Sequence, residues 1–482
     1  MQYGPDRPAF GVGATSTTVH PLILVATALT VLLVLFLPRR RVVYPFLLLI
    51  FLGSIGQQFY IAGIHWFVLR IVILAGLVRV AFATDKTPQG RFGSGWNSVD
   101  TVYVLWAIFR AVTSILQAGG VGGAIIYQTG FLLDALGGYL VLRFLIRDEE
   151  DIVRVIKVFA FIFLTIGVSM LNEKLRSQNI FGYVVGVPIV PDIREGSVRA
   201  QGASAHPILA GVLGVTSVPL FWWLWQSGKS KIMAVLGTIG STLMMLASSS
   251  STPLLAYLGA IAAVCFWPMR KSMRAFRWGV VSVMVALHLV MKAPVWFLIA
   301  RVDLVAGNSG YHRAMLIDQC IRHFWDWWLI GTSTGSWGWD MWDLSNQFVA
   351  EADTGGLVTV ICFILVISRG FSRVGRARKI IEGDTKQEWF MWLIGATLFA
   401  HCVSFFGVSY FDHTKIAWSA FLSILIVATA PILQQETAVK EETGRLFRGA
   451  KLAVASPAVE SSSRSRLPRL ENDEPSKIAP RR

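Results

Sequence analysis

The segment from Val198 to Gly211 brings together residue types that bind an anion. Arg199 supplies a guanidinium, Gly202 lies in a flexible stretch, and His206-Pro207 opens an apolar run. Proline suits the first turn of a helix, and the free N–H groups of a helix start beside a cation favour phosphate. The segment therefore predicts a phosphate site, with an ordinary interfacial arginine beside a helix cap as the alternative.

A second stretch, from His312 to Trp328, projects as an amphipathic helix. Its apolar face consists of Ile317, Ile321, Phe324, Trp325 and Trp328, and its polar face of His312, Asp318, Gln319, Arg322, His323 and Asp326. This pattern predicts a helix at the membrane surface with its tryptophans at head-group depth. Arg313 falls at the edge of the apolar face, where a cation either meets an anion or extends to water. A lipid pyrophosphate would be such an anion, because guanidinium groups bind phosphate oxygens bidentately.

Apolar runs recur along most of the chain and must position these residues. The 482 residues are 54% hydrophobic and 15% charged, and the mean hydropathy is +0.56. Each run of about 20 residues is long enough to cross a bilayer as a helix. We expect an all-α, polytopic membrane bundle of about 12–13 helices over 21–433, after an N-terminal segment 1–20. The expected spans are 21–37, 42–56, 61–83, 97–117, 123–145, 152–170, 206–225, 232–248, 253–268, 277–292, 355–371, 388–409 and 416–433.

The formal net charge of +15 is concentrated in alternate short loops. Such loops face the cytoplasm, which accounts for the charge without a nucleic-acid partner. The C-terminus is then cytoplasmic, and two long segments near 171–205 and 293–354 face outward. Residues 434–482 are rich in Ser, Pro, Glu and Arg, which predicts a disordered cytoplasmic tail that touches anionic membrane lipids.

Charged residues inside the expected spans are costly and need partners. They are Arg70, Asp100, Arg110 and Asp134. Structural pairing is the default interpretation, and we expect Arg110 to neutralise Asp134 on the next span. His288 and His401 are expected to be core histidines. No P-loop, HExxH or paired Cys/His ligand set occurs, so we expect neither cofactor nor metal.

The motif Arg199-x-x-Gly202-x-x-x-His206-Pro207 resembles the O-antigen ligase family, which includes polysaccharide polymerases and O-linked oligosaccharyltransferases. The second outward loop continues the resemblance with Gly310-Tyr311-His312-Arg313, Trp327 to Gly331, Gly335 to Trp339, Ser345-Asn346 and Gly355-Gly356-Leu357. It covers roughly residues 190–430. It implies a bacterial inner-membrane glycosyltransferase of surface or exopolysaccharide biosynthesis. That enzyme moves a glycan from undecaprenyl pyrophosphate to an acceptor at the outer face, without a metal ion.

The resemblance implies that Arg199 and Arg313 contact the pyrophosphate. Gly202, Arg322 and Asn346 complete the expected binding set, and Trp337, Trp339 and Trp342 are candidate platforms for sugar rings. One departure concerns the base: the family has His where this chain has Ser345, and Ser cannot accept a proton near neutral pH unaided. Candidate substitutes are Glu351, Asp353, Asp343, His312 and His206.

Three alternatives stay open at this stage. A polymerase that joins repeat units would share the same motifs. A polysaccharide or lipid transporter would also be polytopic, although it would more naturally show internal repeats. A relative that binds lipid-linked glycan without turnover is favoured by Ser345.

Overall fold

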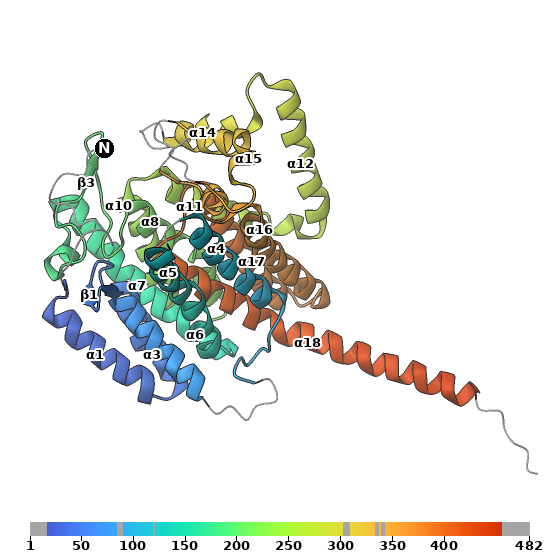
Figure 1. The fold of residues 1–482 in the computed structure, drawn as a ribbon. Coiled ribbons are helices and arrows are strands. Elements are labelled where there is room, and N and C mark those ends of the chain that lie inside the picture. Colours follow the sequence, from blue (N-terminus) through green and yellow to red (C-terminus); the bar gives the residue numbers. More distant parts are fainter. Residues whose placement is uncertain are drawn as a thin grey trace, which may run out of the picture. The chain divides into compact units, whose positions relative to one another are not determined.

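The computed structural model describes residues 17–83, 90–118, 121–301, 309–332, 337–338 and 343–455. Residues 1–16 of the expected N-terminal segment lie outside this description. One compact unit of the chain ends at Leu433, and a separate unit starts at Gln434. Helices dominate the described chain, accompanied by two small β-hairpins (Figure 1).

The helices, in chain order, are α1 (Pro21–Phe36), α2 (Arg39–Leu52), α3 (Val68–Phe82), α4 (Ser98–Gln117), α5 (Val121–Leu132), α6 (Gly138–Leu145), α7 (Glu149–Arg176), α8 (Pro207–Val215), α9 (Val218–Gln226), α10 (Lys231–Ser248), α11 (Ser251–Cys265), α12 (Met273–Val290), α13 (Leu298–Arg301), α14 (Ser309–Arg322), α15 (Phe324–Trp327), α16 (Gln347–Ile380), α17 (Thr385–Phe405) and α18 (His413–Ala455). A π-helical turn, η1 (Leu133–Gly137), joins α5 to α6. Short 3-10 turns occur at η2 (Ile180–Val184), η3 (Trp267–Ser272) and η4 (Val295–Phe297). The strands are β1 (Gln58–Ile61), β2 (Ile64–Phe67), β3 (Asp192–Arg194) and β4 (Ser197–Arg199).

Within the described residues, nine helices are long and apolar enough to cross a membrane. They are Ser98–Gln117, Gly122–Leu145, Glu149–Arg176, Pro207–Gln226, Lys231–Ser248, Trp267–Val290, Gln347–Ile380, Thr385–Phe405 and His413–Glu436. The chain is therefore compatible with a multi-pass helical membrane protein. The other four expected spans correspond to α1, α2, α3 and α11, which are 14 to 16 residues long.

The expected span 61–83 is wrong in its first part, which forms a β-hairpin. β1 and β2 pair antiparallel, with Gln58 opposite Phe67. The turn between them places Ala62 and Gly63 at φ of 52° and 77°, which suits a two-residue hairpin. The aromatic and β-branched residues of this stretch favour strand as well as membrane helix, so its hydropathy alone misassigns it.

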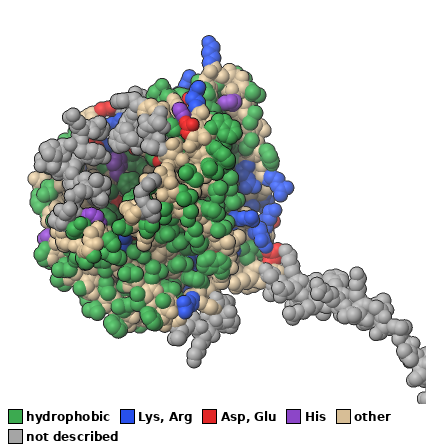
Figure 2. Space-filling view, in the orientation of Figure 1, with side chains coloured by type: hydrophobic (Ala, Val, Ile, Leu, Met, Phe, Trp, Pro, Cys, Tyr) green, Lys and Arg blue, Asp and Glu red, His purple; other side chains and the backbone are tan. Residues whose placement is uncertain are grey.

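Many large hydrophobic side chains of the described unit are exposed, as a lipid environment requires. Figure 2 shows hydrophobic side chains covering the middle of one face, with Lys and Arg side chains gathered at its edge. The 18 residues of α12 include no buried one. His288, expected in the core, lies on this exposed helix, and that expectation is wrong because α12 buries nothing. His401 is buried as expected, and its Nδ1 lies 2.8 Å from the Tyr410 hydroxyl.

Side-chain caps fix where the helices begin. The Asn97 side chain accepts the N–H of Val99 at the start of α4, and Asp100 completes a capping box. Asp148 caps α7 and Asp384 caps α17 in the same manner. These caps satisfy backbone donors that a helix end leaves open.

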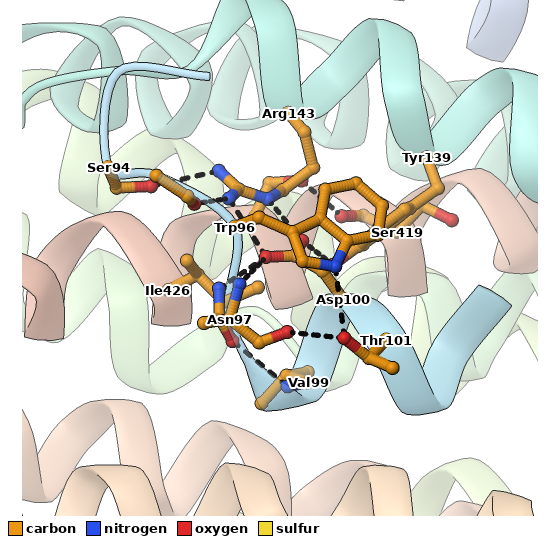
Figure 3. Close-up of polar contacts among 12 residues, drawn as sticks. Ser94, Trp96, Asn97, Val99, Asp100, Thr101, Tyr139, Arg143, Ser419 and Ile426 are labelled. Atoms are coloured by element: carbon orange, nitrogen blue, oxygen red, sulfur yellow. Dashed lines mark hydrogen bonds and ion pairs between the residues drawn. The ribbon is translucent and has the colours of Figure 1, made fainter. Parts of the chain in front are cut away.

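Asp100 has a second role in a buried ion pair (Figure 3). Arg143 of α6 donates to both of its carboxylate oxygens, at 2.7 and 3.2 Å, and the Tyr139 hydroxyl lies 2.6 Å away. Arg143 also donates to Ser94 Oγ and the Gly95 carbonyl. Since both charged groups are fully hydrogen-bonded, the pair is a structural link between α4 and α6, as the pairing interpretation predicts.

The predicted pair Arg110–Asp134 is wrong. Asp134 pairs with Arg70 of α3, with Arg70 Nε and Nη2 lying 3.0 and 2.9 Å from its two oxygens. Arg110 instead lies 3.4 Å from Glu351 of α16. The physical reason is the π-helical turn η1, because an inserted residue rotates the side chains that follow and re-aims Asp134.

Helices extend into both segments that were expected as outward loops. α7 continues to Arg176 and is followed by η2 and the β3–β4 hairpin. α16 starts at Gln347, before the expected span, and changes direction at Gly356 (φ 69°, ψ −172°). α16 packs beside α4 and α17, and α10 packs along α7. α18 continues to Ala455, so the first part of the predicted tail is helical, while 456–482 lie outside the described residues.

Candidate functional site

Arg199 ends strand β4 and is buried, with 8% of its surface exposed. It lies opposite Asp192 in the β3–β4 hairpin, and the Arg199 Nη1 to Asp192 Oδ2 distance is 3.2 Å. Its Nη2 donates to Ser250 Oγ at 3.1 Å. The guanidinium thus joins the hairpin to the point where α10 ends and α11 begins.

The break between α10 and α11 is built from serines. Ser249 adopts φ 45° and its hydroxyl donates to the Val198 carbonyl at 3.1 Å. Lys174, at the end of α7, donates to Ser249 Oγ at 2.6 Å and to the Leu246 carbonyl at 3.0 Å. Lys174 therefore satisfies one open carbonyl group at the end of α10, and the Ala200 N–H satisfies that of Ala247, which fixes the hairpin beside the break.

Glu173 of α7 stabilises the turn that follows Arg199. This fully buried carboxylate accepts the N–H groups of Gln201 and Gly202 at 3.1 and 2.9 Å. Gly202 has φ +56°, and a Cβ there would lie 3.2 Å from Ile166 and Met170. Glycine is required because the turn needs a left-handed backbone in close contact with α7.

His206 caps α8 by accepting the Ile208 N–H on Nδ1 at 3.2 Å. Burial, and next the charge of Arg199, lower its pKa from 6.5 to about 4, against an opposing effect of Asp192. Because so low a pKa makes the imidazole a weak base near neutral pH, the geometry does not favour His206 as a proton acceptor.

Burial also lowers the pKa of Arg199, while Asp192 opposes this and Arg194 adds to it. A guanidinium remains charged in any such environment. Its desolvation makes the buried charge costly, and the ion pair with Asp192 offsets part of that cost. Arg199, Gly202 and His206 are thus brought together at one corner, between the ends of α7 and α10 and the starts of α8 and α11.

The predicted amphipathic helix is broken in two. α14 ends at Arg322, and α15 begins at Phe324 after His323, whose backbone is non-helical. The buried apolar residues of the pair are Ala314, Leu316, Cys320 and Trp327. Ile321, Trp325 and Trp328, from the predicted apolar face, are exposed, and Trp325 is 77% exposed. The helix pair thus buries one face in protein and leaves a second, Trp-rich face exposed, and its depth in a membrane stays a prediction.

Arg313 lies on the buried side of α14 and is 5% exposed. Arg322 is different: it is largely exposed and forms an i,i+4 ion pair with Asp318 at 2.6 Å. Exposed pairs of this kind contribute little energy. Burial, and next the charge of Asp353, raise the pKa of the Cys320 thiol on the same helix to about 12.

Two glycines dock this helix pair onto α16. A Cβ on Gly331 (φ +87°) would lie 2.1 Å from the Asp353 carbonyl oxygen, and one on Gly356 would lie 2.7 Å from the Leu329 carbonyl oxygen. The Leu357 N–H donates to the Trp328 carbonyl, and the Thr332 N–H to the Asp353 carbonyl. The glycines of the sequence motif therefore permit close backbone contact between the outer helices and the kink of α16.

The remaining expected residues of this loop have definite places. Asn346 caps α16 by accepting the N–H groups of Phe348 and Val349. Trp337 is buried in an apolar cluster with Leu316 and Trp327, and its ring stacks on His323. As placed, neither face of Trp337 is open to a sugar. Trp339 and Trp342 lie outside the described residues.

Glu351 is fully buried between α16 and α4. Its carboxylate accepts from Trp106 Nε1 at 2.9 Å and from Gln347 Nε2 at 2.5 Å, and it pairs with Arg110 at 3.4 Å. Two hydrogen bonds and one ion pair fix this carboxylate as a link between the two helices. Asp353 is buried two residues later, and His312 Nε2 lies 2.9 Å from the Asp343 carbonyl oxygen.

Sequence reasoning identified Arg199, Gly202 and His206 but missed Glu173, Lys174 and Ser250. The available signals were the pair Glu173-Lys174, directly after the expected span 152–170, and a run of serines before Pro253. Charges at such a position must meet partners. No group of three or more His, Cys, Asp or Glu in the described ranges could hold a metal ion.

Comparison with known proteins does not assign a family. No family model, curated protein or solved structure matches this chain. The resemblance to O-antigen ligases rests on the short sequence motifs alone.

Proposed function

We propose that this protein transfers a glycan from a polyprenyl pyrophosphate carrier, of the undecaprenyl type, to an acceptor at the outer face of a bacterial inner membrane. The C-terminus is then cytoplasmic, in line with the basic residues of alternate loops. The observation that carries the proposal is the buried Arg199 between the β3–β4 hairpin and the α10–α11 break.

Electrostatics is the contribution that this corner makes to the reaction. An acceptor hydroxyl attacks the anomeric carbon and gives up its proton to water, the bond from that carbon to the carrier pyrophosphate breaks, and negative charge develops on the departing pyrophosphate. A desolvated guanidinium aimed at that charge lowers the barrier without covalent chemistry. Arg199 supplies it from the hairpin, and Arg313, buried on α14, is the second guanidinium of the proposal. In this proposal the α14–α15 pair, which packs on α16, forms the cover of the site.

A second candidate function is binding of the lipid-linked glycan without turnover. Three specific observations favour it. Ser345 stands where the resembled family has a histidine, His206 has a pKa of about 4, and Glu351 is held by two hydrogen bonds and an ion pair. Ser345 and His206 are therefore weak bases near neutral pH, and Glu351 is occupied by contacts within the protein. A polymerase would share the first mechanism with a different acceptor.

The test is transfer of a radiolabelled undecaprenyl pyrophosphate glycan by the purified full chain in lipid vesicles. The wild type is compared with Ser345→His over a panel of acceptors, including the lipid-linked glycan itself. Turnover by the wild type supports the transferase, and growth of the glycan on its own carrier assigns the polymerase. Glycan binding without turnover in the wild type, with activity only in Ser345→His, would overturn the transferase and establish the binder.

A further inference from the structure

A cavity of about 160 Å³ lies among the starts of three helices. Its lining includes Phe67 and Arg70 at the start of α3, Ala205 directly before the α8 cap, and Asp412 and Lys415 at the start of α18. N–H groups at helix starts, with the positive ends of the helix dipoles, favour an anion. Two cationic side chains, Arg70 and Lys415, also line the cavity.

The first cation of the cavity is held in place. Arg70 pairs with Asp134, and the helix carrying Asp134 makes a π-helical turn at this point. Such turns are rare and occur frequently at functional sites. Gly130, one turn earlier, lies so close that a Cβ there would be 2.6 Å from Arg70 Cζ. The ion pair with Asp134 therefore holds the guanidinium on one side, and the absence of a side chain at Gly130 leaves the space that it occupies on the other.

The second cation of the cavity is Lys415. Among the described residues, its ammonium has no hydrogen bond or ion pair, and it lies 5.0 Å from the centre of the Phe131 ring. The carboxylates of Asp134 and Asp412 line the same cavity, but each has another partner. Asp134 pairs with Arg70, and Asp412 accepts the Ala205 N–H at 2.7 Å and lies 3.2 Å from His413 Nδ1. The ammonium of Lys415 therefore keeps donors for an anion that enters the cavity.

We propose that this cavity binds one phosphoryl group between Lys415 and Arg70. Its volume suits a single small group, well below the roughly 300–1,000 Å³ of sites for larger ligands. Ile55, Phe411 and Ile416 give part of the lining an apolar character that suits the chain of a lipid. The phosphoryl group belongs either to a membrane lipid or to free phosphate. The inference goes beyond glycan transfer and holds whether or not the protein is a transferase.

The experiment measures binding of dioleoyl phosphatidic acid to the purified full chain in detergent, with inorganic phosphate as competitor and dioleoylglycerol as the uncharged control. The wild type is expected to bind phosphatidic acid and not dioleoylglycerol. Lys415→Met keeps the side-chain stem over Phe131, removes the charge and should weaken binding about tenfold or more. Lys415→Arg, which restores a cation, should bind as the wild type does, provided both variants unfold at similar temperatures.

A second pair of variants tests the cavity without changing any charge. Gly130→Ala displaces the Arg70 guanidinium and should weaken binding, whereas Gly123→Ala on the same helix meets nothing within 4 Å and should not. Competition by inorganic phosphate would show that the phosphoryl group suffices, and its failure to compete would assign the site to a lipid head group. Equal binding of dioleoylglycerol, or full binding by Lys415→Met, would overturn the inference. Glycan transfer by Arg199 variants is a separate measurement and does not decide it.

Discussion

At the scale of single residues, the local sequence pattern pointed to each candidate site residue, whereas the tertiary structure determines which residues contact it. Arg199, Gly202 and His206 stand in one short motif, so the sequence suffices to identify them. Glu173 reaches the same turn from a different helix, and nothing in its local sequence specifies Gly202 as its partner. Ser250 and Asp192 likewise meet Arg199 only after the chain folds.

His206 gives a prediction for the pH dependence of stability. Its pKa is about 4 in the folded chain and 6.5 ordinarily, so folding favours the neutral imidazole. The stabilisation is complete above pH 6.5 and is lost as the pH falls towards 4. We expect about 1–2 kcal/mol less stability at pH 5 than at pH 7.5.

The measurement is thermal unfolding in detergent at both pH values. His206→Asn keeps a capping acceptor that does not titrate, and its loss on acidification should be smaller than that of the wild type. Identical pH dependence in the two proteins would show that His206 is not desolvated in the folded chain.

At the scale of helices and strands, regular hydropathy was predictable and departures from regularity were not. The long spans follow from apolar length alone. The hairpin at 58–67 lies in an apolar run whose hydropathy also suits a membrane helix. The π-helical turn at 133–137 has no signal in the sequence pattern, so the predicted partner of Asp134 was wrong. A single inserted residue changes which side chains face each other, and composition does not report it.

Docking of the outer helices onto α16 depends on Gly331. Gly331→Ala should destabilise this contact by about 2 kcal/mol or more, because its Cβ would overlap the Asp353 carbonyl and its φ is +87°. Limited proteolysis between 293 and 354 should be faster in the variant. Gly228→Ala has a similar φ of +71° with nothing within 4 Å, and so measures the backbone strain alone. Equal rates of proteolysis in the two variants would show that Gly331 is not needed for docking of the α14–α15 pair onto α16.

At the scale of the whole molecule, an apolar helical unit carries polar residues at a few defined places. The link around Asp100 and Arg143 is satisfied within the protein and holds helices together. Arg199, beside the β3–β4 hairpin, and Lys415, in the cavity, are the cations proposed to bind anions. This separation explains why deletion of a charge is expected to unfold the protein at the first place and to weaken ligand binding at the other two.

The most direct test of the central claim is equilibrium binding of undecaprenyl pyrophosphate to the full chain in nanodiscs. Arg199→Ala is compared with Arg176→Ala, which removes an exposed charge at the end of α7. If Arg199 binds the pyrophosphate, Arg199→Ala raises Kd about 10- to 100-fold and Arg176→Ala leaves it unchanged. The same Kd for wild type and Arg199→Ala would contradict the account.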